Sequence, residues 1–86
     1  TRQMALDFGG DNIRVNAVCP GFIDTRLNDG LSGEDRRFFL QKLPIASAGT
    51  PADVAGMTAF LCGAGGRYIT GAAIPVDGGQ IAGLRD

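Results

Sequence analysis

Residues 15–25, VNAVCPGFIDT, contain the residue types best suited to hold a ligand. The first part is apolar, as in a strand, and Pro20 interrupts it because proline cannot donate to a strand ladder. Gly21 follows, and the hydroxyl of Thr25 comes four residues later. A loop that opens at the end of a strand is a common place for a ligand, so we expect this loop to bind one.

The residues for acid–base chemistry are few. No histidine is present, which excludes a Ser-His-Asp triad, a Cys-His pair and histidine metal sites within these residues. One lysine, Lys42, and one tyrosine, Tyr68, lie 26 positions apart. They cannot form a Tyr-Lys general-base pair at i and i+4 of one helix. Asp77 precedes Gly78-Gly79, and turn formation explains this aspartate better than catalysis does.

The remaining polar groups and thiols favour structural roles. Asn16 falls inside the expected strand, where a structural hydrogen bond is more common than a catalytic role. Arg14 is expected in an ion pair rather than at an anion site. Cys19 and Cys62 lie in apolar surroundings, so we expect buried, reduced thiols. Tyr68 is expected to pack near the start of the last strand.

The composition limits the classes of partner. The 86 residues allow at most one small domain, with 44% apolar residues, 20% charged residues and a net charge of −1. Phosphate binding needs a basic patch, so the near-neutral charge argues against a nucleic-acid partner. No apolar run is long enough to cross a membrane, and we expect no membrane partner.

The elements that position the loop follow from periodicity, caps and breakers. The clearest helix begins at Thr50, with Pro51 and Asp53 completing a capping-box-like start. Small residues form one stripe on that helix, and Gly56 within it suits the close approach of another backbone. We expect, in order, a helix that stops at Gly9-Gly10, a strand over Ile13–Cys19, a short helix capped by Ser32, the helix from Thr50, and an edge strand from Gly71 that contains Pro75.

This order of elements predicts two parallel strands joined through helices. A parallel sheet is buried on both faces, and two strands cannot cover their own faces. The chain also begins at Thr1 within an expected helix. We therefore expect these residues to be part of a larger α/β layer.

Three blocks, IRVNAVCPGFIDT, GTPADVAGMTAFL and RYITGAAIPVDGG, occur in this order. In them the chain resembles the C-terminal third of the short-chain dehydrogenase/reductase family, of the 3-oxoacyl-[acyl-carrier-protein] reductase kind. The resemblance implies a doubly wound Rossmann sheet, NAD or NADP as cofactor, and hydride exchange between nicotinamide and a small carbonyl or alcohol. It also implies a cytoplasmic homo-oligomer, a dimer or tetramer. Residues 1–27 would hold the end of the catalytic helix, a strand and the cofactor loop, residues 28–49 a substrate lid, and residues 50–86 a helix, the last strand and a tail.

The resemblance assigns roles to individual residues. Pro20 and Gly21 would wall the nicotinamide, Ile23 would bind the carboxamide through its backbone, and Thr25 would offer its hydroxyl to the carboxamide or a phosphate. The substrate lid would include Phe22, Leu27, Phe38 and Phe39. No catalytic residue is assigned, because the family's Ser, Tyr and Lys are absent. The family's glycine-rich phosphate loop is absent too, since the GAGG of residues 63–66 follows a helix and is expected to end it.

Three interpretations remain open at this point. The first is part of an NAD(P)-dependent carbonyl–alcohol oxidoreductase that is inactive by itself. The second is a non-enzymatic interaction module that uses the exposed sheet face and the small-residue helix. The third is part of an enoyl reductase, whose related fold shares this region.

Overall fold

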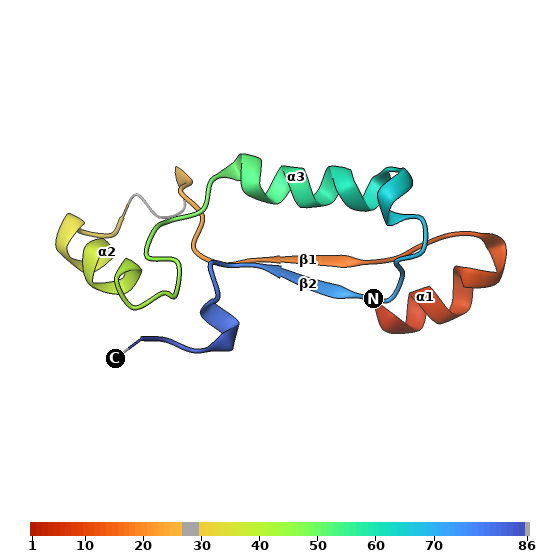
Figure 1. The fold of residues 1–86 in the computed structure, drawn as a ribbon, viewed down its shortest axis with the longest axis horizontal. Coiled ribbons are helices and arrows are strands. Elements are labelled where there is room, and N and C mark those ends of the chain that lie inside the picture. Colours follow the sequence, from red (N-terminus) through yellow and green to blue (C-terminus); the bar gives the residue numbers. More distant parts are fainter. Residues whose placement is uncertain (27–29, 86) are drawn as a thin grey trace.

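The computed structural model describes residues 1–26 and 30–85, and these form a helix–strand–helix–helix–strand arrangement (Figure 1). This order agrees with the expected one, and the fold is a small α/β unit. The elements are α1 (Arg2–Phe8), β1 (Ala17–Pro20), α2 (Gly33–Leu40), α3 (Pro51–Cys62) and β2 (Ala73–Val76). Short 3-10 turns follow α1, α3 and β2, at Gly9–Asp11, Ala64–Gly66 and Gln80–Ala82.

The two strands form a parallel pair, as predicted. Its register runs from Ala17 opposite Ala73 to Pro20 opposite Val76. Figure 1 shows α3 along one face of this pair, α1 on the other side near the amino ends, and α2 beyond the carboxyl ends. The carboxyl ends of both strands therefore point toward the predicted lid.

The first strand is shorter than the expected Ile13–Cys19 and starts only at Ala17. Before that point the main chain is joined to the segment that precedes β2 by one bond to a side chain and one bond to the backbone. The amide of Val15 donates to the hydroxyl of Thr70 at 3.1 Å, and the carbonyl of Val15 accepts from Gly71 at 2.8 Å. The hydroxyl of Thr70 thus takes the place of one backbone acceptor, and regular strand pairing begins only after this point.

The amide side chain of Asn16 joins the two strands where their regular pairing begins. Its Nδ2 donates to the carbonyl of Ile69 at 2.9 Å, and its Oδ1 accepts from the amide of Ala72 at 3.1 Å. The predicted structural role of Asn16 is confirmed. The ion pair predicted for Arg14 is wrong for the described residues, because its guanidinium instead donates to the same Ile69 carbonyl at 3.4 Å.

The two helices with predicted N-caps, α2 and α3, start where those caps predict. The hydroxyl of Ser32 accepts from the amide of Asp35 at 3.0 Å, which begins α2. At α3, the Thr50 hydroxyl accepts from the Asp53 amide, and the Asp53 carboxylate accepts from the Thr50 amide at 2.7 Å. This reciprocal pair is a full capping box, with Pro51 at the first helical position.

α1 ends at Phe8, immediately before Gly9-Gly10, so the predicted stop is confirmed. Gly9 keeps right-handed helical angles, and the chain tightens into a 3-10 turn over the two glycines. The left-handed residue that ends this turn is Asn12, with φ of 62°. Asparagine tolerates this conformation better than most residues, so it takes the role expected of glycine.

The helix α3 buries part of its apolar stripe of Val54, Met57 and Leu61, whereas Phe60 is exposed. Leu61 is buried, while Val54 and Met57 are half-buried. The stripe of small residues lies on the exposed surface, and a Cβ added at Gly56 would meet nothing within 4 Å. Within the described residues, no backbone makes the close approach that the stripe was expected to allow.

Little of the chain is buried within itself. Of the described apolar residues, Ala5, Leu43 and Leu61 form the buried core, and Leu43 is fully buried. The radius of gyration is 15.7 Å, against about 12 Å for a compact domain of this length. Both cysteines are free but exposed, and Tyr68 is 93% exposed, so their expected burial is wrong. The described residues do not provide a layer that covers these three side chains.

The Asn16 bridge generates a stability prediction. Replacing Asn16 with Leu leaves the Ala72 amide without its acceptor and the Ile69 carbonyl without its closest donor. We expect Asn16→Leu to lower the free energy of unfolding by about 2 kcal/mol, measured by urea titration. Gln3→Leu is the control, since it removes an exposed side-chain bond to Asp7 and should cost far less. Equal losses in the two variants would contradict the structural role.

Candidate functional site

The loop that leaves β1, Pro20–Thr25, is named the Pro-Gly loop. It begins at the carboxyl end of the strand, as predicted. The amide of Gly21 donates to the carbonyl of Val76 at 3.1 Å, which continues the pairing of β1 with β2 by one more bond. The start of the loop is therefore fixed by the last residue of β2.

The segment before α3 holds the other end of the Pro-Gly loop. Gly49 donates its amide to the carbonyl of Phe22 at 2.9 Å, and its carbonyl accepts from the amide of Asp24 at 2.8 Å. These bonds form an isolated parallel bridge between Ile23 and Gly49. A Cβ at Gly49 would lie only 2.8 Å from the Cδ1 of Ile23, so this approach suits glycine. The loop is thus held from two sides.

Gly21 in the Pro-Gly loop lies against a residue that could not be predicted from the sequence. A Cβ at Gly21 would lie 2.6 Å from the Cβ and 2.7 Å from the Cα of Asp77. Because backbone atoms of Asp77 cannot move aside as the end of a flexible side chain can, a Cβ at Gly21 would clash. The DGG motif was recognised as a turn, but no local signal in the sequence shows that this turn lies against Gly21.

One cavity brings together all four residues predicted to bind the cofactor. It has a volume of about 570 Å³, within the usual range of ligand pockets, and lies between the Pro-Gly loop and the start of α3. Within residues 1–26 and 30–85, the hydroxyl of Thr25 has no hydrogen-bond partner, so it caps no described part of the loop. The lining residues are Pro20, Gly21, Ile23, Thr25, Pro51, Val54 and Ala55.

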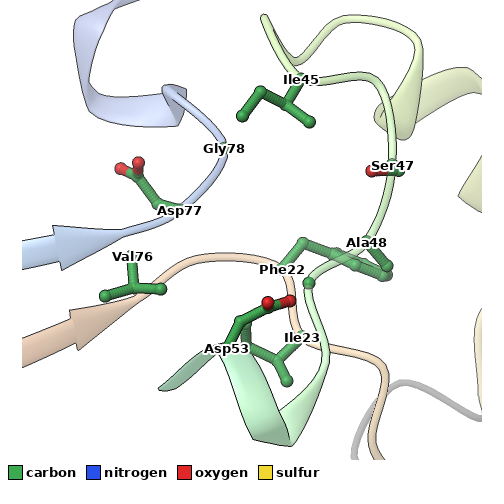
Figure 2. Close-up of a pocket in the computed structure, with 10 residues that line it drawn as sticks. Phe22, Ile23, Ile45, Ser47, Ala48, Asp53, Val76, Asp77 and Gly78 are labelled. Carbon is green, nitrogen blue, oxygen red and sulfur yellow. The ribbon is translucent and has the colours of Figure 1, made fainter. Parts of the chain in front are cut away.

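A second cavity, of about 370 Å³, lies on the lid side of the Pro-Gly loop (Figure 2). Phe22, Ile45 and Val76 give it apolar walls, and two carboxylates border it. Both carboxylates are already used: Asp53 caps α3, and Asp77 accepts from amides in the turn after β2. Figure 2 shows the Asp77 carboxylate directed toward that turn and away from Asp53. Neither aspartate is placed as an acid or base.

The predicted lid helix packs on the Pro-Gly loop through aromatic rings. The rings of Phe22 and Phe39 have centroids 5.4 Å apart with an interplanar angle of 40°. The guanidinium of Arg36 lies 5.3 Å from the Phe22 ring and 3.3 Å from the carboxylate of Asp24. Phe38, by contrast, is 61% exposed on another side of the helix. This contact is chiefly apolar, because an exposed ion pair contributes little.

The remaining predicted residues do not converge on the loop. Leu27, assigned to the lid, lies outside the described residues. The segment between α3 and β2, which carries Tyr68, lies at the end of the molecule opposite α2 (Figure 1), and Lys42 follows α2.

In the part of the chain that the structure describes, no group of three or more Cys, Asp or Glu could hold a metal ion. None of the described helices is long and apolar enough to cross a membrane.

A parallel strand pair with a ligand-sized cavity at its carboxyl end defines part of a Rossmann-type α/β protein. Residues 1–80 match the family described as Enoyl-(Acyl carrier protein) reductase. The chain belongs to the short-chain dehydrogenase/reductase family, which confirms the resemblance drawn from the sequence.

Curated relatives support the same assignment. The chain is 44% identical over 82 residues to meso-2,3-butanediol dehydrogenase of Serratia marcescens, covering 95% of this chain and 33% of the relative. It is 42% identical over 79 residues to the 3-oxoacyl-[acyl-carrier-protein] reductase MabA of Mycobacterium tuberculosis, covering 92% and 32%. The chain thus spans about a third of the length of these relatives.

Solved structures match the fold closely. The structure of 4-hydroxyisoleucine dehydrogenase complexed with NADH superposes with a TM-score of 0.91 at 34% identity, over 96% of this chain and 35% of that one. A blue fluorescent protein from a metagenomic library, in complex with NADPH, gives a TM-score of 0.83 at 43% identity, over 92% and 32%. The Rossmann-type fold predicted from the sequence is therefore confirmed.

The contact between Gly21 and Asp77 generates a prediction about the loop. Gly21→Ala must displace either the Pro-Gly loop or the turn, and we expect a loss of about 1–3 kcal/mol in the free energy of unfolding. Gly33→Ala is the control, because a Cβ there meets nothing within 4 Å. Urea titration of both variants measures the difference, and a Gly21→Ala protein as stable as Gly33→Ala would disprove the clash.

Proposed function

We propose that this chain supplies the nicotinamide-side wall and the substrate lid of an NAD(P)-dependent oxidoreductase that interconverts a small carbonyl and an alcohol. The observation that carries this proposal is the 570 Å³ cavity, since Pro20, Gly21, Ile23 and Thr25 all line it. Further support comes from relatives described as dehydrogenases and reductases, and from similar structures described with NADH or NADPH.

The residues of the Pro-Gly loop suit the nicotinamide end of the cofactor. When bound, NAD(H) or NADP(H) supplies or accepts the hydride. Pro20 and Gly21 form an apolar wall with little side-chain bulk, against which a flat ring fits. A carboxamide carries one acceptor and two donors, so the backbone of Ile23 and the hydroxyl of Thr25 can fix its orientation. A fixed ring presents one face to the substrate, which is the main requirement for hydride transfer.

The lid role rests on the packing of α2 against the Pro-Gly loop. Phe22, predicted as a lid residue, lies in the Pro-Gly loop, and Phe39 lies on α2. Their ring contact closes the apolar space between the two elements. An apolar closure excludes water from a reacting carbonyl. Phe38, whose ring is exposed on another side of the helix, and Leu27 stay predicted members of the lid.

Proton transfer to the substrate oxygen is assigned to residues outside these 86. The chain has no histidine, and its single tyrosine and single lysine lie on segments at opposite ends of the molecule. The phosphate-binding glycine loop is not part of this sequence either. We therefore propose that the chain does not turn over substrate by itself.

The family description favours a second candidate function, the reduction of an enoyl thioester. This reaction uses the same nicotinamide wall but delivers hydride to a carbon–carbon double bond. The relatives described as butanediol dehydrogenase and 3-oxoacyl reductase favour the carbonyl reaction. The two candidates differ in substrate, so assays with an enoyl thioester and with a ketone separate them.

The exposed small-residue face of α3 is proposed as a contact with a second copy of the protein. A helix with glycine and alanine on its surface allows another backbone to come close, and the surface around Gly56 is open. A dimer or a tetramer would use this face, and a cytoplasmic location stays a prediction.

A chimera tests the proposed function. This chain would replace the matched third of the S. marcescens butanediol dehydrogenase, to which it is 44% identical. We expect the chimera to oxidise 2,3-butanediol with reduction of NAD or NADP, followed at 340 nm, and the isolated chain to show no turnover. A folded but inactive chimera would favour the non-enzymatic interaction module, and turnover by the isolated chain would refute the assignment of proton transfer to other residues.

The role of Thr25 is tested in the same chimera. We expect Thr25→Val to raise the KM for the nicotinamide cofactor about tenfold, which corresponds to one lost hydrogen bond, and Thr25→Ser to restore it. Thr70→Val is the matched control, because that hydroxyl binds the Val15 amide at the amino end of the strands. The assignment fails if Thr25→Val and Thr70→Val give the same cofactor KM.

A further inference from the structure

The turn that follows β2, residues 77–79, holds the segment that returns from the lid helix. The amide of Ile45 donates to the carbonyl of Gly78 at 2.9 Å. On the other side of Pro44, the carbonyl of Lys42 accepts from the amide of Arg85 at 2.6 Å. Both backbone bonds join the base of the lid to the part of the chain after β2.

The packing at this junction leaves no room for a side chain at Gly79. Gly79 has φ of +91°, and a Cβ there would lie 2.8 Å from the Cγ and 2.9 Å from the Cβ of Pro44. Gly78 has φ of +64°, and its Cβ would lie 3.4 Å from the carbonyl oxygen of Ile45. The lid base is therefore in direct contact with two glycines.

The same turn also touches the Pro-Gly loop. Its shape is fixed by the Asp77 carboxylate, which accepts from the amide of Gly79 at 2.9 Å and from the amide of Ile81 at 3.0 Å. The backbone of Asp77 then lies against Gly21, with no space for a Cβ. One rigid turn thus contacts the loop on one side and the base of the lid on the other.

The cavity of 370 Å³ lies between these contacts. Its walls come from the Pro-Gly loop at Phe22 and Ile23, from the segment of residues 45–49 that follows α2, and from residues 76–78 at the end of β2 and in the turn (Figure 2). A shift of the turn relative to the lid base changes the width of this cavity. The ring contact between Phe22 and Phe39 holds the lid helix on one side only, so by itself it would let the lid tilt.

We propose that Gly79 is a positioning residue that sets the distance between the substrate lid and the Pro-Gly loop. This inference rests on the proposed function of those two elements. Gly79 acts through Pro44 and does not contact the substrate. Its lack of a side chain lets the lid base sit against the turn, so substrate affinity depends on a residue outside both the loop and the lid.

The test compares Gly79→Ala with Gly71→Ala in the chimera. Gly71 has φ of +75°, so both variants place alanine in the left-handed region, but a Cβ at Gly71 makes only an ordinary contact of 3.5 Å with Ala5. We expect Gly79→Ala to raise the KM for 2,3-butanediol about tenfold and leave kcat within about twofold. Gly71→Ala should lower the melting temperature to a similar extent and leave KM unchanged.

Hydrogen exchange supplies a readout that does not need turnover. In the full chain and in the chimera, we expect the Ile45 amide to exchange about tenfold faster in Gly79→Ala, since its bond to Gly78 lengthens, and at the original rate in Gly71→Ala. Adding Pro44→Ala to Gly79→Ala removes the ring atoms at 2.8 and 3.4 Å, and should bring the raised KM part of the way back to its original value.

The outcomes separate the two proposals. An inactive chimera would count against the proposed function, while the exchange rates of Ile45 would still decide whether Gly79 holds the lid base. Equal changes of KM and exchange in Gly79→Ala and Gly71→Ala would overturn the inference. If Gly79→Ala does not fold, Pro44→Ala alone removes the Cγ and Cδ atoms that Pro44 places against Gly79, and an unchanged Ile45 exchange rate in that variant would overturn the inference as well.

Discussion

The register of the parallel strand pair is the constraint on which the rest of the structure depends. Pro20 is paired with Val76, so the Pro-Gly loop and the turn after β2 leave the sheet side by side. Their contact at Gly21 and Asp77 follows directly from that alignment. A slip of one residue would turn every strand side chain to the other face and separate the two. Asn16 opposes such a slip, because it bonds the segment before β2 at two points.

Features coded by neighbouring residues could be predicted from the sequence. Ser32 caps one helix, and Thr50 and Asp53 cap another, because each bond spans three residues and the residue types reveal it. The parallel pairing followed from the order of elements, and the Rossmann-type class followed from the resemblance of three sequence blocks to the family. The site was predicted as far as the loop is concerned: its four assigned residues line one cavity, although their binding of a cofactor stays a prediction.

Features that depend on distant or absent partners could not be predicted. The contact of Gly79 with Pro44 joins residues far apart in sequence, and a positive φ at a glycine does not say what it faces. Tyr68 and Cys19 illustrate a different limit. Their apolar surroundings in the sequence indicate burial, yet burial requires a covering layer that these residues do not provide, and both are exposed.

The strand pairing also has a consequence for the order of events during synthesis. Asn16 and its partner Ala72 are separated by 56 positions. At a translation rate of about 5–20 residues per second, β1 waits on the order of several seconds before its partner strand is made. The edge of β1 that pairs with β2 has no partner from this part of the chain over that interval. The loop geometry can thus be established only after nearly all of these residues have left the ribosome, which makes its formation a late folding event.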